Sequence, residues 1–345
     1  MDHRKPLIEV KNLKTHFFLD EGTVRAVDGA DFNIAQGETL GIVGESGCGK
    51  SVTARSIMQI VTRPGKIVDG QILYHRHRWN HGSSAGQEIV DLTALHPQSD
   101  EMRYIRGSEI AMVFQEPMTS LSPVHTVGNQ IAEVIILHQK VSKEEAWQKA
   151  IEMLAFVGMP LPNRTIEQYS YQLSGGMRQR AMIAMALSCN PALLIADEPT
   201  TALDVTTEAQ ILRLMRRLQD ELGMAIMFIT HNLGVVAQMA ENVVVMYMGK
   251  VVELASVETI FHAPAHPYTR ALLQSIPRLG HKTMQRRRLA SIKGMVPDSF
   301  ALPQGCAFHP RCSAMKYGVC DQEEPPMIEV EPGHKVACIR YGEIT

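Results

Sequence analysis

The stretch ETLGIVGESGCGKSVTARSIM, residues 38–58, constrains the fold of this 345-residue chain more than any other. The apolar run Leu40–Val43 predicts a buried strand, and residues 52–58 continue as a helix. Between them, Gly44–Ser51 matches the pattern G-x-x-x-x-G-K-S/T, whose glycines let backbone N–H groups turn toward the phosphates of a nucleotide. A glycine-rich turn that merely starts a helix is the alternative, but the lysine, the hydroxyl and both flanking elements are in place. The sequence therefore predicts an α/β protein that binds a nucleotide.

The residues of this loop are predicted to hold ATP together with Mg²⁺. Lys50 is expected to reach the outer phosphates, and the hydroxyl of Ser51 is expected to ligate the metal. The helix that begins here adds partial positive charge. The predicted nucleotide-binding set is Gly44, Glu45, Ser46, Gly47, Cys48, Gly49, Lys50, Ser51 and Val52.

A second apolar run, Ala192–Ala196, ends in two adjacent carboxylates. α/β sheets place their chemistry at the carboxyl ends of buried parallel strands. We therefore predict that Asp197 belongs to the magnesium shell and that Glu198 orients and deprotonates a water molecule. Two acids after a strand are often only the N-terminal cap of a helix, which is the alternative interpretation.

The stretch YQLSGGMRQRAMIAMAL, residues 171–187, raises a separate question. Ser174, Gly175 and Gly176 open a helix-like run, which is the build of an anion-binding turn. No lysine stands beside them, and the chain already has a better phosphate site upstream. These residues alone leave open whose phosphate such a turn would bind.

Together these motifs resemble the ATPase subunits of ABC transporters, and LSGGM at 173–177 is the motif that singles out that family. In the family this turn binds the γ-phosphate of ATP held by a partner ATPase, which implies two subunits arranged head to tail. The resemblance also implies roles for Gln115 in sensing magnesium and for His231 in contacting the γ-phosphate. It implies further that Asp204 lies in a loop at the dimer interface and that Phe17 stacks on adenine, although a core phenylalanine fits Phe17 nearly as well.

The C-terminal part narrows the resemblance. HPYTRALLQSIP at 266–277 and GCAFHPRC at 305–312 are similar to the oligopeptide, dipeptide and nickel importer branch, so that the resemblance covers nearly the whole chain. It implies an ATP-hydrolysing import subunit that powers peptide uptake, with a sister ATPase in a heterodimer, two membrane permeases and an extracytoplasmic solute-binding protein as partners. The implied location is the cytoplasmic face of a bacterial inner membrane. Nickel, glutathione or another solute remains an alternative cargo.

Four cysteines lie near the C-terminal end, separated by 5, 7 and 17 residues: Cys306, Cys312, Cys320 and Cys338. Four thiolates bind either zinc or an iron–sulfur cluster. Zinc sites more often use short pairs of the form C-x(2–4)-C, which are absent here, and the family resemblance favours a 4Fe–4S cluster. Reduced cysteines buried in a small irregular domain are the alternative.

The charge and hydropathy of the chain argue against several classes of protein. A formal net charge of −2 argues against nucleic-acid binding. The start MDHRKPLIEV is not expected to be a signal peptide, and the best candidate for a membrane span is broken by Asn190 and Pro191.

Rival functions are a soluble ABC ATPase of translation or DNA repair and a regulatory module that senses nucleotide or redox state. Such ATPases usually carry two cassettes or a long coiled coil, whereas this chain has one compact set of motifs.

The motifs also predict a domain plan. We expect a P-loop NTPase of the ABC type at 1–262, with a RecA-like core, an antiparallel β subdomain and an α-helical subdomain at about 117–172. A small cysteine-containing domain is expected at 263–345. The segment 75–87, which contains three histidines, is predicted to be a solvated loop.

Overall fold

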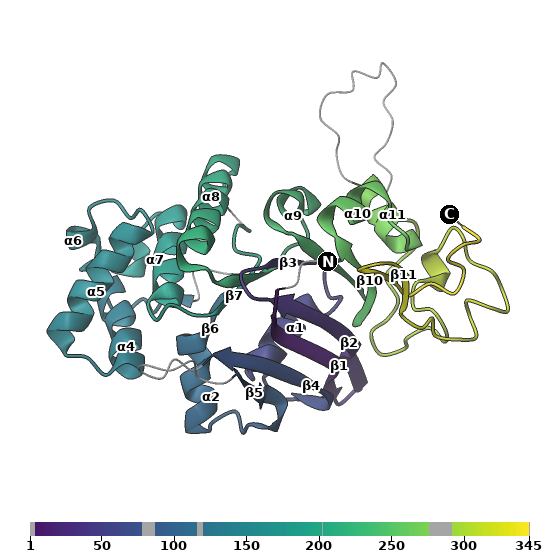
Figure 1. The fold of residues 1–345 in the computed structure, drawn as a ribbon, viewed down its shortest axis with the longest axis horizontal. Helices are drawn as coiled ribbons and strands as arrows, with labels where there is room; N and C mark the ends of the chain where they lie inside the picture. Colours follow the sequence, from purple (N-terminus) through teal and green to yellow (C-terminus); the bar gives the residue numbers. More distant parts are fainter. Residues whose placement is uncertain (1–3, 78–86, 116–119, 202, 276–291, 345) are drawn as a thin grey trace, which may run out of the picture. The chain divides into compact units, whose positions relative to one another are not determined.

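The computed structural model describes residues 4–77, 87–115, 120–201, 203–275 and 292–344. The chain divides into two compact units, and each is described by itself. Unit 1 comprises residues 1–33, 40–93 and 230–345, and unit 2 comprises residues 34–39 and 94–229. Figure 1 follows the path of the chain from the N-terminus in purple to the C-terminus in yellow.

Unit 1 contains a four-stranded sheet in the order β2-β1-β4-β5. The strands are β1 (Pro6–Leu19), β2 (Gly22–Ala35), β4 (Gly65–His77) and β5 (Gln87–Asp91), and β4 runs antiparallel to both β1 and β5. His75 and Arg76, which were expected to begin a solvated loop, lie in β4 and are buried. His75 Nε2 lies 2.5 Å from Glu9 Oε1 on β1, which is why the strand continues. His77 and Gln87 of that segment pair between β4 and β5, and residues 78–86 lie outside the described residues.

Five further strands of unit 1 follow in the order β11-β12-β10-β9-β3. They are β3 (Thr39–Val43), β9 (Asn242–Tyr247), β10 (Lys250–Ser256), β11 (Ile328–Glu331) and β12 (His334–Val336). β3 pairs in parallel with β9 and is buried along its whole length, as its continuous apolar sequence predicts. The helices of this unit are α1 (Lys50–Ile57), α9 (Leu233–Met239), α10 (Val257–His262), α11 (Pro267–Gln274) and the 3₁₀ turn η4 (His309–Arg311).

The tail, defined here as residues 292–344, has little regular secondary structure but shares the hydrophobic core of unit 1. Phe308 of the tail and Tyr268 of α11 pack in one cluster with Val43 of β3 and Tyr247 of β9. Tyr268 is fully buried, and Phe308 is 2% exposed. Each such ring contributes roughly 1.5–3 kcal/mol by burial. The tail is therefore continuous with the core that carries β3.

A buried carboxylate also links the tail to the sheet. Glu253 of β10 has no exposed surface. Its Oε1 accepts from the backbone N–H of Ala265 at 2.6 Å, and its Oε2 accepts from that of His266 at 3.0 Å. His334 Nε2, on β12, lies 2.8 Å from Glu253 Oε1. A buried charge is tolerated when its hydrogen bonds are satisfied in this way.

Unit 2 combines three parallel strands with a group of helices. The strands are β6 (Ile110–Val113), β7 (Leu193–Asp197) and β8 (Ala225–Ile229), with β7 in the middle. The helices are α2 (Asp100–Tyr104), α4 (Val127–Gln139), α5 (Lys143–Phe156), α6 (Pro162–Thr165), α7 (Gly175–Leu187) and α8 (Val205–Leu222). Short helical turns complete the unit: η2 (Ile105–Glu109) and η3 (Ser170–Gln172). The turn η1 (Leu92–Ala94) lies where the chain passes from unit 1 to unit 2. Helices α4, α5 and α7 pack together (Figure 1).

Candidate functional site

The predicted site residues are divided between the two units. Phe17, residues 44–52 and His231 lie in unit 1, whereas Gln115, residues 174–176, Asp197, Glu198 and Asp204 lie in unit 2. The four cysteines of the tail belong to unit 1. Contacts are therefore described within each unit.

The phosphate loop, residues 44–51, runs from β3 into α1 and approaches neighbouring strands closely. Gly49 has a φ of 103°, and a Cβ at this position would lie 2.3 Å from the carbonyl oxygen of Ala26. Gly44 has a φ of 153°, and its Cβ would lie 2.2 Å from the carbonyl oxygen of Met246. Only glycine fits at these two positions, because any side chain meets fixed backbone.

Lys50 is the first residue of α1, and its side chain lies back over the loop. Nζ donates to the carbonyl oxygens of Gly44, at 2.8 Å, and Glu45, at 2.9 Å. The residue is 6% exposed. Cys48 Sγ lies 3.7 Å from the same Nζ, and burial raises the pKa of this thiol. An ammonium group held against a helix start favours phosphate oxygens at this loop.

The other predicted residues of unit 1 lie at its surface or in its sheets. Ser46, Gly47 and His231 are exposed, whereas Ser51 and Val52 are half-buried in the first turn of α1. His231 lies between β8 and α9, and the next residue, Asn232, caps α9 by accepting from the N–H of Gly234 at 3.0 Å. Phe17 is half-buried, and its ring packs so closely on Gly65 of β4 that a Cβ at Gly65 would lie 2.6 Å from it.

Unit 2 places the two carboxylates at the end of β7. Asp197 is the last residue of the strand and is 2% exposed. Glu198 follows with a φ of 47°, a left-handed conformation that costs a non-glycine residue about 1 kcal/mol. Its Oε2 accepts hydrogen bonds from Gln115 Nε2 and from the hydroxyl of Thr201, both at 2.9 Å. The structure thus brings the predicted residues Gln115 and Glu198 into direct contact, and two donors orient the carboxylate.

The serine–glycine turn forms the start of α7. The hydroxyl of Ser174 caps the helix by accepting from the N–H of Met177 at 3.3 Å. Ser174 and Gly175 are exposed at the start of this 13-residue helix, where the first N–H groups have no partner within the helix backbone. Arg178 directs its Nε to the carbonyl oxygen of Ser170 at 2.7 Å, away from the turn.

Asp204 has a clear local role as the N-cap of α8. Its carboxylate accepts from the backbone N–H groups of Thr206 and Thr207, each at 3.0 Å, and from the hydroxyl of Thr207 at 2.7 Å. The bonds from Thr207 lower the pKa of Asp204. The same threonine lies against the serine–glycine turn, because a Cβ at Gly176 would lie 2.8 Å from its methyl group. The starts of α7 and α8 are therefore packed together.

The four tail cysteines line one small cavity of about 20 Å³: Cys306, Cys312, Cys320 and Cys338. Burial raises the pKa of Cys306 to about 11. Burial also raises the pKa of Cys312 and of Cys338. Four sulfur donors around one cavity match the donor set of an iron–sulfur cluster. As placed, no three His, Cys, Asp or Glu side chains of the described residues are grouped to hold a metal ion, so the predicted 4Fe–4S cluster is not supported by this arrangement and stays a prediction.

Two residues that contact the phosphate loop carried no predicted role. The hydroxyl of Tyr268 accepts from the backbone N–H of Glu45, and Arg311 forms an ion pair with the Glu45 carboxylate. Both lie in the sequence motifs 266–277 and 305–312, which were noted only as family features. The polar and aromatic residues of these two motifs were the available signal in the sequence. They do not indicate that Tyr268 and Arg311 contact the phosphate loop.

Comparisons with known proteins agree with these motifs. A family model described as ABC transporter matches residues 27–201, and one described as Oligopeptide/dipeptide transporter, C-terminal region, matches residues 252–320. The chain is 50% identical to the probable peptide ABC transporter ATP-binding protein y4tR of Sinorhizobium fredii, over 98% of this chain and 96% of that protein. It is 49% identical to the oligopeptide transport ATP-binding protein AppD of Bacillus subtilis, over 98% and 97%.

A solved structure extends the likeness to the fold. The ATP-binding cassette MJ0796, in a dimeric post-hydrolysis state bound to ADP and Pi, aligns with a TM-score of 0.60 and 28% identity. The alignment covers 72% of this chain and 98% of that one. None of the helices in the described ranges is both long and apolar enough to cross a membrane.

Proposed function

The chain belongs to the ABC transporter family, within the group of peptide-import ATP-binding proteins, and on this basis we propose that it is the ATP-hydrolysing subunit of a membrane importer for peptides. The ABC nucleotide-binding cassette fold predicted from the sequence is confirmed. The observation that carries the proposal is the joint match of a cassette and a peptide-transporter C-terminal region to one chain.

The phosphate loop supplies the nucleotide site of unit 1. Lys50 and the loop amides bind the triphosphate, and Ser51 ligates Mg²⁺, which neutralises charge on the phosphoryl group when bound. Phe17 stacks on adenine, and His231 contacts the γ-phosphate. The exposed position of His231 at the end of β8 supports this role.

The carboxylates of unit 2 supply the hydrolytic groups. Asp197 and Gln115 belong to the coordination shell of Mg²⁺. Glu198 acts as general base on the attacking water. The two hydrogen bonds to Glu198 and its left-handed backbone support this assignment, since a strained, oriented side chain is typical of functional sites.

The serine–glycine turn at 174–176 binds the γ-phosphate of ATP on a second ATPase subunit, and Asp204 lies at that interface. The exposed start of α7 supports the role, because a helix N-terminus attracts anions without needing a lysine. The complete importer comprises a sister ATPase, two permeases and an extracytoplasmic solute-binding protein, with this subunit peripheral at the cytoplasmic face of the bacterial inner membrane.

The division at residue 262 separates a cassette from a C-terminal region with its own cofactor. Cys306, Cys312, Cys320 and Cys338 would hold a 4Fe–4S cluster, which would stabilise a segment that has few strands or helices of its own. Their convergence on one cavity supports the proposal. Anaerobic purification followed by iron and sulfide analysis tests it, and a zinc content of one per chain without iron would contradict it.

Replacement of Glu198 tests the catalytic scheme. Glu198→Gln retains the hydrogen-bonding shape but cannot accept a proton, so ATP turnover falls roughly 10²- to 10⁴-fold. ATP binding persists, and the closed dimer accumulates. Near-normal hydrolysis by this variant would remove Glu198 from the base role.

Reconstitution tests the transport function. Copurification from the native host is expected to recover two permeases and a second ATPase, and vesicles containing the complex are expected to accumulate labelled di- or oligopeptide only with ATP. Uptake of Ni²⁺ but not of peptide would contradict the proposed cargo and leave the ATPase role intact.

A further inference from the structure

Glu45, the second residue of the phosphate loop, is held from two sides within unit 1. Its backbone N–H donates to the hydroxyl of Tyr268 at 2.9 Å. Its carboxylate accepts two parallel hydrogen bonds from Arg311, from Nη1 to Oε2 at 2.6 Å and from Nη2 to Oε1 at 3.0 Å. A bidentate pair of this kind fixes both the position and the orientation of a carboxylate.

Arg311 is itself fixed by the tail and by β9. Its backbone N–H donates to the carbonyl oxygen of Phe308 at 3.0 Å. Its Nη1 lies 3.3 Å from the Tyr247 hydroxyl, and its guanidinium lies 5.8 Å from the centre of that ring. The side chain is 4% exposed, so it depends on its partner for charge compensation. Hydrogen bonding by Glu45 raises the pKa of Arg311 above its usual range.

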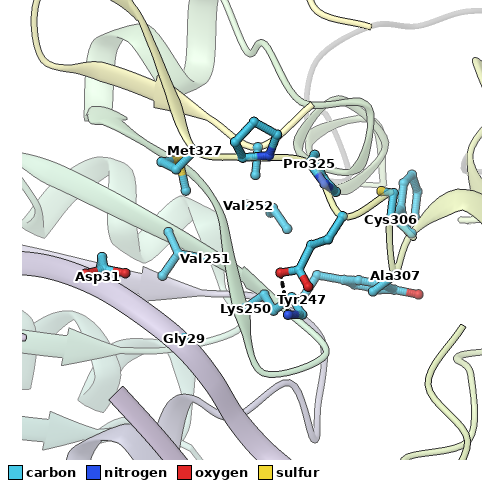
Figure 2. Close-up of a pocket in the computed structure, with 14 residues that line it drawn as sticks. Gly29, Asp31, Tyr247, Lys250, Val251, Val252, Cys306, Ala307, Pro325 and Met327 are labelled. Carbon is cyan, nitrogen blue, oxygen red and sulfur yellow. Dashed lines mark hydrogen bonds and ion pairs between the residues drawn. The ribbon is translucent and has the colours of Figure 1, made fainter. Parts of the chain in front are cut away.

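Aromatic packing joins this arginine to the rest of the tail. The ring of Phe308 lies 5.2 Å from that of Tyr247 and 5.3 Å from that of Tyr268. Figure 2 shows the adjoining cavity of about 210 Å³, where Cys306 of the tail and Tyr247 both contribute to the lining. Arg311 therefore extends to the loop from a segment whose own packing is fixed.

We propose that Arg311 is a positioning residue for the phosphate loop: it neutralises and orients Glu45, so that ATP binding depends on the tail. The inference rests on the proposed nucleotide-binding role of the loop. Arg311 acts through Glu45 and makes no contact with the nucleotide in this scheme.

Two physical effects act in the same direction. The loop must bind a polyanion, and an uncompensated carboxylate within it would repel the phosphates. The backbone carbonyl oxygen of Glu45 also accepts a hydrogen bond from Lys50 Nζ. When Glu45 moves, Lys50 therefore loses one of the groups that fix its position. Removing Arg311 therefore weakens ATP binding through both charge and position.

The test measures binding of a fluorescent ATP analogue with Mg²⁺ to the purified full-length chain. Arg311→Met is expected to raise Kd about tenfold, the effect of losing a hydrogen-bonded charge pair. Arg311→Lys keeps the charge but not the bidentate geometry, and Kd is expected to rise about threefold. Because Arg311→Lys retains the charge needed for folding, an unchanged Kd in this variant would overturn the proposal even if Arg311→Met does not fold.

A second-site change separates positioning from a merely structural role. Glu45→Gln combined with Arg311→Met removes the uncompensated charge and is expected to return Kd to within about threefold of wild type. Recovery of Kd with the same thermal unfolding midpoint in the single and the double variant would exclude a defect in tail folding as the cause. Failure of the double variant to recover, with a wild-type thermal unfolding midpoint, would overturn the proposal.

Arg340 provides the matched control. It pairs with Glu343 of the tail through Nε at 3.1 Å, and Arg340→Met is expected to leave Kd unchanged. An equal loss of affinity in this variant would show that any tail arginine has the effect and would overturn the inference. Lys50→Ala tests the loop itself: wild-type affinity there would contradict the proposed function, whereas loss of binding there with normal binding by Arg311→Met contradicts only the inference.

Discussion

The phosphate loop and the serine–glycine turn are both helix starts built from glycine and a hydroxyl residue, yet their surroundings differ. The phosphate loop contains the buried Lys50 and is held by Tyr268 and Arg311. The turn at 174–176 is exposed, and its serine caps its own helix. The first arrangement offers an ammonium group to a phosphate, whereas the second offers a serine hydroxyl, backbone N–H groups and a helix dipole.

Under the proposed function, this difference predicts that the two helix starts bind anions with unequal strength. A site without a cation suits a phosphate whose charge is already neutralised by magnesium and lysine elsewhere. The comparison therefore predicts that changes at the two helix starts have different signatures: loss of nucleotide binding at one, and loss of pairing between subunits at the other.

The largest effect is expected from Lys50→Ala. Removing the ammonium group leaves the loop with backbone donors alone, like the turn, and ATPase activity should fall roughly 10³-fold. Binding of ATP by the purified single chain should be lost as well. Equilibrium titration checks this, and retained affinity would show that the two helix starts are alike.

Ser174→Ala should affect only the assembled ATPase. The single chain should bind ATP with unchanged Kd, while turnover of the complex falls roughly 10²-fold through loss of one donor to the partner's phosphate. Loss of the cap should also lower the free energy of unfolding by about 1 kcal/mol. The comparison fails if single-chain affinity falls as much as turnover.

Glycine replacements probe the space behind each helix start. At Gly49 a Cβ meets the fixed carbonyl oxygen of Ala26 and φ is positive, so Gly49→Ala should lower the free energy of unfolding by about 3 kcal/mol. At Gly176 a Cβ would lie 2.8 Å from the methyl group of Thr207, a side chain held by Asp204, but it would meet no backbone, so Gly176→Ala should cost about 1–2 kcal/mol. Urea unfolding measures both, and equal costs would contradict the contrast.

The smallest effect concerns pH and the support of the phosphate loop. Burial lowers the pKa of His266 from its ordinary value of 6.5 to about 3, and its Nδ1 accepts from the N–H of Tyr268 at 3.1 Å. The unfolded chain therefore binds more protons below pH 6.5, and this contribution to stability, complete above that value, is lost as pH falls.

Between pH 6.5 and pH 5.5 the loss should be about 1 kcal/mol. Urea unfolding at both values measures it, and His266→Gln should flatten the dependence because glutamine does not titrate. Hydrogen exchange should show the weakening at α11 before it appears at α7. An unchanged slope in the variant would assign the pH dependence to other groups.

The sequence predicted those features that depend on local pattern. Apolar runs located β3 and β7, and the glycine–lysine pattern located the loop between β3 and α1. The helical region at 117–172 corresponds to α4, α5 and α6 where it is described. In each case spacing alone determines the result.

Contacts between distant residues could not be predicted in this way. Glu45 and Arg311 are 266 positions apart, and no local pattern indicates that they meet. The left-handed backbone of Glu198 is likewise set by its contacts with Thr201 and the end of β8 rather than by its own preference. The buried position of His75 depends on Glu9, which lies on another strand.

Glu253 limits how these chains can be rearranged in evolution or in the laboratory. Its carboxylate obtains its donors from Ala265, His266 and His334, all beyond residue 262. Truncation of the chain at residue 262 would leave the buried carboxylate of Glu253 without its hydrogen-bond donors in an apolar core. Grafting the C-terminal segment of a relative onto this chain should succeed only when that segment supplies matching hydrogen-bond partners for Glu253.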